Sequence, residues 1–72
     1  MSRKKTELRA IFAETRHRFP HVNEHAFEVL FHGWRQQQLR HGRGSDKHFT
    51  EILNRGWLYD TEAESLREYI GR

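Results

Sequence analysis

Residues 23–42 read NEHAFEVLFHGWRQQQLRHG, and this stretch decides how the chain folds. Its apolar side chains recur every three or four residues, as along one face of a helix, at Phe27, Leu30, Phe31 and Trp34. Asn23 is a favourable N-cap residue, and Gly42 is a residue type that commonly follows a helix. Gly33, inside the helix, indicates a close crossing with another helix. The stretch therefore predicts a helix that runs to about Arg40 or His41, with an aromatic stripe facing a core.

Three further helices are expected from the same kinds of signal. They run from about Ser2 to Arg18, from Ser45 or Asp46 to Gly56, and from Asp60 or Thr61 to Gly71. Pro20 ends the first, because the residue before a proline disfavours the helical conformation. Residues 57–59 are expected to be an apolar connector, and no stretch alternates with a period of two for long enough to predict a strand. The sequence thus predicts an all-α fold, a small bundle of about four short helices that forms one domain over residues 1–72.

The composition limits what the protein can be. The chain has 72 residues and no cysteine, which excludes disulfides and thiolate zinc sites. A core of this size supplies about 3–5 kcal/mol of net stability, which suggests a homodimer as a further source of stability. No apolar run approaches the roughly 20 residues that cross a bilayer, and no apolar segment follows the charged N-terminus as in a signal peptide. We therefore expect a cytoplasmic protein with no membrane partner.

The charge is positive and unevenly distributed. The net charge is +3 with neutral histidines, and six histidines can add to it. Residues 1–48 contain ten Lys/Arg and five Asp/Glu, whereas residues 49–72 contain three Lys/Arg and five Asp/Glu. A basic body with an acidic C-terminal part is informative about binding partners rather than about the fold.

The stretch RHGRGSDKH, residues 40–48, combines features that suit a phosphate group. A glycine-rich turn allows close approach of the backbone, and a helix N-terminus presents unpaired N–H groups. Two interpretations stay open, a turn that binds phosphate and an ordinary capping turn with solvated cations. The candidate nucleic-acid-binding residues of the turn and of the first and third helices are Lys5, Arg9, Arg16, Arg40, Arg43, Lys47, Asn54 and Arg55.

The first and third helices contribute different contacts to this nucleic-acid hypothesis. Lys5, Arg9 and Arg16 form one stripe on the first helix, where they would follow a phosphate backbone. Asn54 and Arg55 on the third helix are residue types that pair with base edges. The second and third helices would then form a loose helix-turn-helix pair in a small regulatory protein. DNA and RNA are both open as targets.

A protein-interaction module is the alternative function. An exposed aromatic side chain beside acidic residues is typical of a docking patch, and the candidates are Tyr59, Glu62, Glu64 and Glu68. Trp57 is expected to cover the core, which leaves Tyr59 as the exposed aromatic residue. Such a module would be an adaptor, or an inhibitor of a larger nucleic-acid-processing machine, of the kind that phages and plasmids encode.

No enzyme signature is present, so we expect a non-enzymatic protein without a cofactor. The serines lack the GxSxG context of a nucleophile, and a chain this short leaves little room for a pocket. One group of possible metal ligands falls close together on the helical wheel, at His21, His25, Glu28 and His32. They face away from the apolar stripe and the HExxH motif is absent, so we expect no metal site. A pH-responsive surface is the alternative interpretation, and whether this face has a role stays open.

Overall fold

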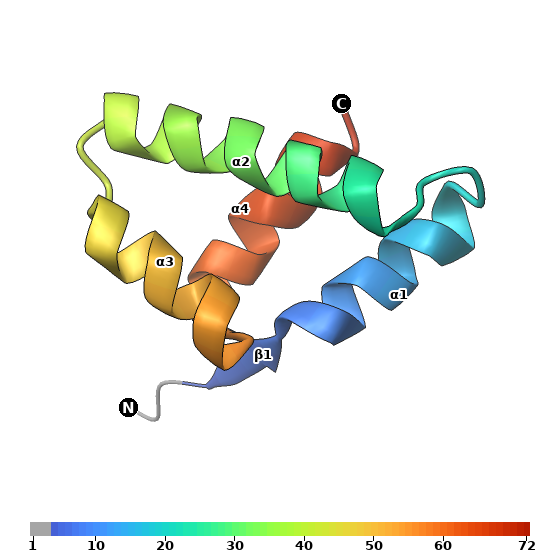
Figure 1. The fold of residues 1–72 in the computed structure, drawn as a ribbon, viewed down its shortest axis with the longest axis horizontal. Helices are drawn as coiled ribbons and strands as arrows, with labels where there is room; N and C mark the ends of the chain where they lie inside the picture. The colour runs from blue at the N-terminus through green and yellow to red at the C-terminus, as the bar shows by residue number, and fades with distance from the viewer. Residues whose placement is uncertain (1–3) are drawn as a thin grey trace.

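Three helices lie around the edges of the molecule, and a fourth crosses behind them (Figure 1). The computed structural model describes residues 4–72. Its elements in chain order are β1 (Lys5–Glu7), α1 (Leu8–Arg18), α2 (Glu24–Arg40), α3 (Asp46–Arg55), β2 (Trp57–Tyr59) and α4 (Asp60–Ile70). Over the described residues, this arrangement confirms the predicted all-α bundle and adds a two-stranded antiparallel sheet. No helix in residues 4–72 has the length and apolar character needed to cross a membrane.

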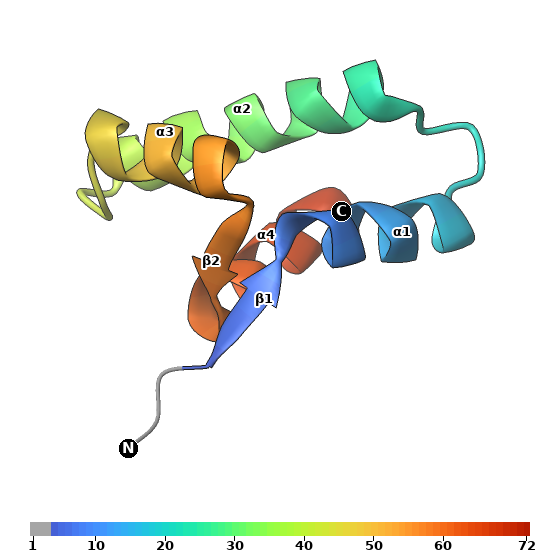
Figure 2. The ribbon, with the colours of Figure 1, turned by 60° about the horizontal axis from the view of Figure 1, so that its bottom comes forward.

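Residues 5–7 form a strand rather than a turn of the first helix. The expected helix start near Ser2 lies outside the described residues, and α1 begins only at Leu8. Figure 2 shows β1 and β2 side by side, with Lys5 opposite Tyr59, Thr6 opposite Leu58 and Glu7 opposite Trp57. We call this pair of strands the ribbon. The prediction of no strand was wrong, because strands this short show no clear period of two and each needs a partner from the other end of the chain.

Hydrogen bonds at both ends hold the ribbon to the helices. The Leu8 amide donates to the Gly56 carbonyl (2.8 Å), and the Asp60 amide donates to the Lys4 carbonyl (3.1 Å). The Thr6 hydroxyl donates to the Asp60 carboxylate (2.5 Å). The start of α1 is therefore fixed against the end of α3, and the start of α4 is fixed against β1.

The helix caps follow the prediction in two cases. The Asn23 side chain accepts a hydrogen bond from the Ala26 amide (2.8 Å), and the Ser45 hydroxyl accepts one from the His48 amide (3.2 Å). Gly42, directly after the end of α2, has a φ of +71°, a backbone conformation that glycine adopts without strain.

The fourth helix begins differently from the prediction. Its N-cap residue is Tyr59 rather than Asp60 or Thr61. The Glu62 carboxylate accepts a hydrogen bond from the Tyr59 amide (2.8 Å), as the residue three positions after the N-cap does in a capping box. Asp60 is already the first residue of α4, and its carboxylate accepts a hydrogen bond from Thr6 of the ribbon.

Trp34 lies at the centre of the core. Its side chain is 1% exposed, and its ring centroid lies 5.5 Å from that of Phe31 and 5.4 Å from that of Phe49. The indole N–H donates to the Ser65 hydroxyl oxygen (3.0 Å). Each helix contributes one other large, fully buried side chain to the core. In chain order these are Ile11, Phe31, Phe49 and Leu66. The core therefore joins all four described helices.

Gly33 marks a close crossing of α2 and α4, as the sequence predicted. A Cβ atom at this position would overlap the Tyr69 hydroxyl oxygen and would lie 3.2 Å from Tyr69 Cζ. The absence of a side chain at Gly33 is therefore what lets the Tyr69 ring lie across α2.

Two ion pairs join helices at the surface. Arg67 of α4 donates to Glu14 of α1, with Nε 2.8 Å from Oε2, and Arg35 of α2 lies 2.9 Å from the Asp46 carboxylate of α3. The hydrogen bond from Arg67 lowers the pKa of Glu14, and the same bond raises the pKa of Arg67. These pairs hold α1 to α4 and α2 to α3.

Gly33→Ala should destabilise the protein by about 1–3 kcal/mol, because the added methyl group overpacks the crossing. The same substitution in a Tyr69→Phe background should cost much less, because the overlapping oxygen is gone and alanine favours the helix by about 1 kcal/mol. Urea denaturation of the four proteins of this double-mutant cycle measures the coupling between the two positions. Additive effects would contradict the close crossing.

The Glu14–Arg67 pair should make a small, pH-dependent contribution to stability. Because the pKa of Glu14 is lowered from its ordinary 4.5, the contribution is present above pH 4.5 and is lost as the pH falls through the lowered value. Both side chains are partly exposed, so solvent screening limits the contribution to about 0.2–1 kcal/mol. The difference in free energy of unfolding between wild type and Glu14→Gln should therefore shrink from about pH 7 to about pH 3. A constant difference would show that the pair does not titrate with folding.

Candidate nucleic-acid interface

Most of the described cations have no acidic partner. Within residues 4–72, Arg35 and Arg67 are the two Lys/Arg side chains with a carboxylate oxygen within 4.0 Å. All eight predicted nucleic-acid-binding residues are exposed. Arg16 additionally lies over the ring of Phe12, with its guanidinium carbon 5.7 Å from the ring centroid. The positive charge of the predicted residues is therefore accessible to a ligand.

The predicted basic stripe on the first helix is broken, because Lys5 lies in β1. Arg9 and Arg16 remain on α1. The turn of residues 40–48 lies at the far end of the longest axis from the C-terminal end of α1 (Figure 1), in a molecule that extends 32 × 27 × 22 Å. The structure thus divides the predicted residues among three places and does not form one continuous phosphate track.

The turn between α2 and α3 has the geometry of a compact cap. A Cβ atom at Gly44 would lie 2.9 Å from the Phe49 ring, and the φ of Gly44 is +83°. Ser45 caps α3 with its hydroxyl, and Asp46 places a carboxylate in the first helical turn. Ser45 therefore already caps one amide of the α3 N-terminus, and Asp46 adds a negative charge there, so what the turn offers a ligand is mainly the charge of exposed cations such as Lys47.

Arg43 belongs to a different surface from Lys47. It lines two hollows, of about 150 and 250 Å³, together with Gln38 of α2 and Ser65 of α4. Acidic residues of α4 line these hollows as well, Glu68 in the smaller one. A phosphate beside Arg43 would therefore also meet carboxylates.

Lys5 instead lines a hollow between α3, the ribbon and the start of α4. The hollow has a volume of about 230 Å³. It is lined by Lys5, His48, Glu51, Ile52, Arg55, Trp57, Leu58, Tyr59 and Glu62. Two cations and two aromatic residues from three different elements thus surround one space. We call Lys5, Arg55, Trp57 and Tyr59 the basic–aromatic face.

Trp57 is 47% exposed, which corrects the expectation that it covers the core. Leu58 fills that role at 2% exposure, and Tyr59, expected to be the exposed aromatic residue, is half-buried. Successive residues of a strand point to opposite faces, so Trp57 must point outward when Leu58 points inward. The sequence signal for Trp57 was misread because residues 57–59 were treated as a connector with no fixed faces.

The predicted docking residues of α4 do not share one surface. Glu62 Oε2 lies 2.5 Å from His48 Nε2, and Glu62 Oε1 accepts from the Tyr59 amide. Glu64 is two residues after Glu62 and therefore points about 200° away from it around the helix axis. Glu64 and Glu68 are both exposed. Glu62 therefore links α3 to α4, and the exposed acidic pair lies elsewhere on α4.

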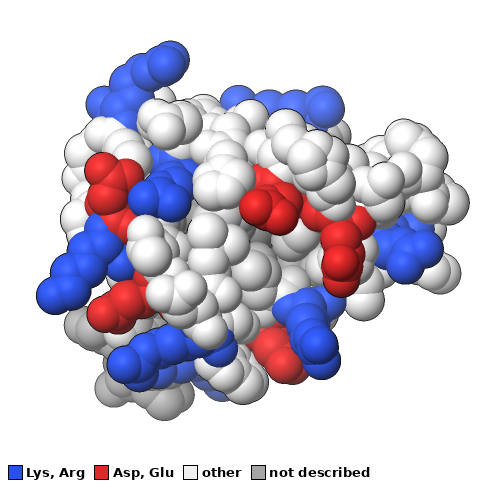
Figure 3. All heavy atoms as spheres, viewed as in Figure 1, with Lys and Arg blue, Asp and Glu red and all other residues white. Residues whose placement is uncertain are grey.

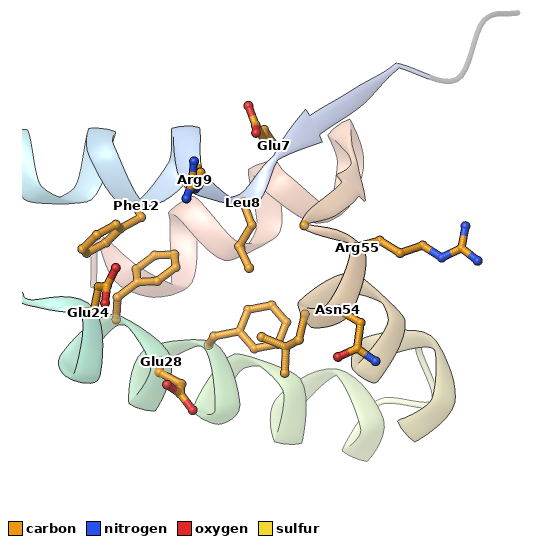
Figure 4. A pocket seen from close by; sticks show the side chains of 12 residues that line it. Glu7, Leu8, Arg9, Phe12, Glu24, Glu28, Asn54 and Arg55 are labelled. Carbon is orange, nitrogen blue, oxygen red and sulfur yellow. The ribbon is translucent and has the colours of Figure 1, made fainter.

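An apolar groove that the sequence analysis did not predict opens between α1, α2 and α3 (Figure 4). Its volume is about 430 Å³. Its apolar members are Leu8, Phe12, Phe27, Phe31 and Leu53. Its charged and amide members are Glu7, Arg9, Glu24, Glu28, Asn54 and Arg55, of which Arg55 extends away from the groove in Figure 4. Figure 3 shows the same face with uncharged surface at its middle and charges of both signs around it.

The histidine-rich face is only partly helical. His21 lies in the turn before α2, and Glu28 and His32 lie on α2 with Oε1 and Nε2 3.8 Å apart. Between residues 4 and 72, no three His, Cys, Asp or Glu side chains are grouped in a way that could hold a metal ion.

No protein-family model, curated protein or solved structure matches this chain. Its class is therefore defined by its own features, a small helical domain closed by a two-stranded ribbon. The surface features that distinguish it are the basic–aromatic face beside α3 and the apolar groove on the other side of that helix.

Glu62→Ala should lower the free energy of unfolding by about 1–3 kcal/mol, because it removes the acceptor of both His48 and the Tyr59 amide. Glu64→Ala, on the exposed side of the same helix, is the matched control and should stay within about 0.5 kcal/mol of wild type. Urea denaturation followed by circular dichroism compares the two. Equally small effects at both positions would show that Glu62 does not link α3 to α4.

Proposed function

We propose that this protein is a small, non-enzymatic nucleic-acid-binding protein with a regulatory role, and that it binds through α3 and the ribbon. The observation that carries the proposal is the basic–aromatic face. Its cations, Lys5 and Arg55, line one hollow with Trp57 and Tyr59, and no carboxylate of residues 4–72 lies within 4.0 Å of either. Cations attract phosphates whatever the sequence, and aromatic rings offer surfaces to bases.

The exposed side of α3 extends this face. Lys47 lies at its start, and Asn54 and Arg55 lie at its end, all exposed. Lys47 and Arg55 are eight residues apart, which separates them by about 12 Å along the axis of α3. Cations at this separation can contact different phosphates of one strand. Asn54 and Arg55 are also the residue types that hydrogen-bond base edges.

Glu51 limits the strength of this interaction. It is exposed on α3, one helical turn from Lys47 and one from Arg55. A carboxylate in this position repels phosphates that approach the two cations. We therefore expect salt-sensitive binding in which only a few phosphates are neutralised.

The groove favours a second candidate, a non-enzymatic protein-interaction module. Leu8, Phe12 and Leu53 are half-buried there, so apolar side chains of a partner would complete their burial. A groove between helices is a common seat for an amphipathic helix of another protein. In this case the partner would be a component of a larger machine, and docking would use α1 and α2 rather than Glu62.

Lys5→Gln and Arg55→Gln should each weaken binding to oligonucleotides, and Glu51→Gln should strengthen it. Each lost cation should make the slope of log affinity against log salt shallower by about 0.7–0.9. Fluorescence anisotropy of labelled DNA and RNA between about 50 and 200 mM salt measures both quantities. Arg16→Gln, on α1, is the matched control and should leave the slope unchanged.

An equal effect of Arg16→Gln would place the interface on α1 instead of the ribbon. If wild type binds neither duplex nor single-stranded DNA or RNA at about 50 mM salt, nucleic-acid binding is wrong and the protein-interaction module is favoured.

A further inference from the structure

The outer face of the ribbon is made of four side chains. The register pairs Lys5 with Tyr59 and Glu7 with Trp57. Because residues alternate between the two faces of a strand, these four share one face. Leu58, on the other face, is 2% exposed and belongs to the core, so the face that carries Trp57 is the solvent side.

The surroundings of Trp57 distinguish it from an ordinary exposed apolar residue. Val29 and Trp57 are the exposed large hydrophobic residues of the described chain, and scattered residues of this kind are normal on protein surfaces. Trp57, however, lines the same hollow as Lys5 and Arg55. A large aromatic surface beside two cations without acidic partners is a combination that suits an anion carrying an aromatic group.

The size of the hollow suits one planar group. Its volume of about 230 Å³ is below the roughly 300–1,000 Å³ of pockets that enclose a drug-sized ligand. A nucleobase is planar and stacks on tryptophan, and its backbone carries a phosphate on each side. The two phosphates that flank a stacked base offer one anion to each of the two cations of the basic–aromatic face.

We propose that Trp57 stacks on an unpaired base of a single-stranded nucleic acid, while Lys5 and Arg55 hold the neighbouring phosphates. The proposal rests on the nucleic-acid-binding function proposed above and names the form of nucleic acid. In a duplex each base face is covered by its neighbour, whereas a single strand exposes its bases to a protein ring. Tyr59, about 6.6 Å further along the same face, lines the hollow as a second aromatic wall.

The acidic residues near this face direct the strand rather than prevent its binding. Glu62 is engaged by His48 and by the Tyr59 amide. Glu7, opposite Trp57, and Glu51, on α3, are exposed without an ion pair among the described residues. Both repel phosphates, so the backbone of a bound strand would pass away from Glu7 and toward Lys5. Glu51 lines the same hollow as Arg55 and would weaken the phosphate contact there.

The fluorescence of the two tryptophans allows binding and folding to be followed without a label. Trp34 is 1% exposed and hydrogen-bonded to Ser65, whereas Trp57 is 47% exposed. Titration of the full chain with single-stranded oligothymidylate should quench the emission of Trp57, because the ring stacks on a base. The emission of Trp34 should stay constant and serves as a monitor of folding in Trp57→Phe, in which the titration should produce no quenching.

Trp57→Leu should weaken binding to oligothymidylate about 5- to 150-fold, as expected for the loss of one base–aromatic stack. Trp57→Phe keeps an aromatic ring and should retain most of the affinity. Duplex DNA of the same length should bind at least about tenfold more weakly than the single strand, with no effect of Trp57→Leu. Val29→Ala removes the other exposed apolar side chain and should change neither affinity.

Unchanged affinity of Trp57→Leu for the single strand would overturn the stacking proposal. If Lys5→Gln and Arg55→Gln still weaken binding to duplex and single strand alike, nucleic-acid binding stands without the stack. If wild type binds neither form, both proposals are overturned.

Discussion

The pairing of β1 with β2 is the constraint on which the other features depend. It delays the start of α1 to Leu8 and sets that start against the end of α3. It brings Thr6 to the Asp60 carboxylate at the start of α4, where Glu62 accepts from the Tyr59 amide. It turns Leu58 into the core and therefore Trp57 into solvent. One ladder of three residues on each side thus determines the ends of two helices and the chemistry of one surface.

Signals that act between near neighbours made much of the fold predictable. Asn23 caps α2 by accepting a hydrogen bond from the amide three residues later. The absence of a side chain at Gly33 indicates the close helix crossing. The errors concern residues whose partners are distant in sequence. The spacing of Lys5 to the later arginines fits a helical stripe, and residues 57–59 read as a connector with Trp57 covering the core. Both are decided by strand pairing, which no local pattern encodes. Of the candidate site, Arg55 was anticipated from residue type, whereas its aromatic neighbour was not.

The third helix separates two surfaces of different chemistry. On one side lies the apolar groove, and on the other the hollow of the basic–aromatic face. Arg55, at the end of α3, lines both. Lys5 and Trp57 belong only to the second side. The ten residues of α3 thus contribute both to a positively charged surface, which they share with the three residues of β2, and to an apolar one, within a small fold.

The ribbon also has a consequence for how the chain is made. Residues 5–7 leave the ribosome long before residues 57–59, and at about 5–20 residues per second the interval is about 3–10 s. During that interval α2 and α3 can form through contacts that are local in sequence, while β1 has no strand to pair with. The basic–aromatic face is therefore among the last parts of the molecule to form, because it needs both strands of the ribbon.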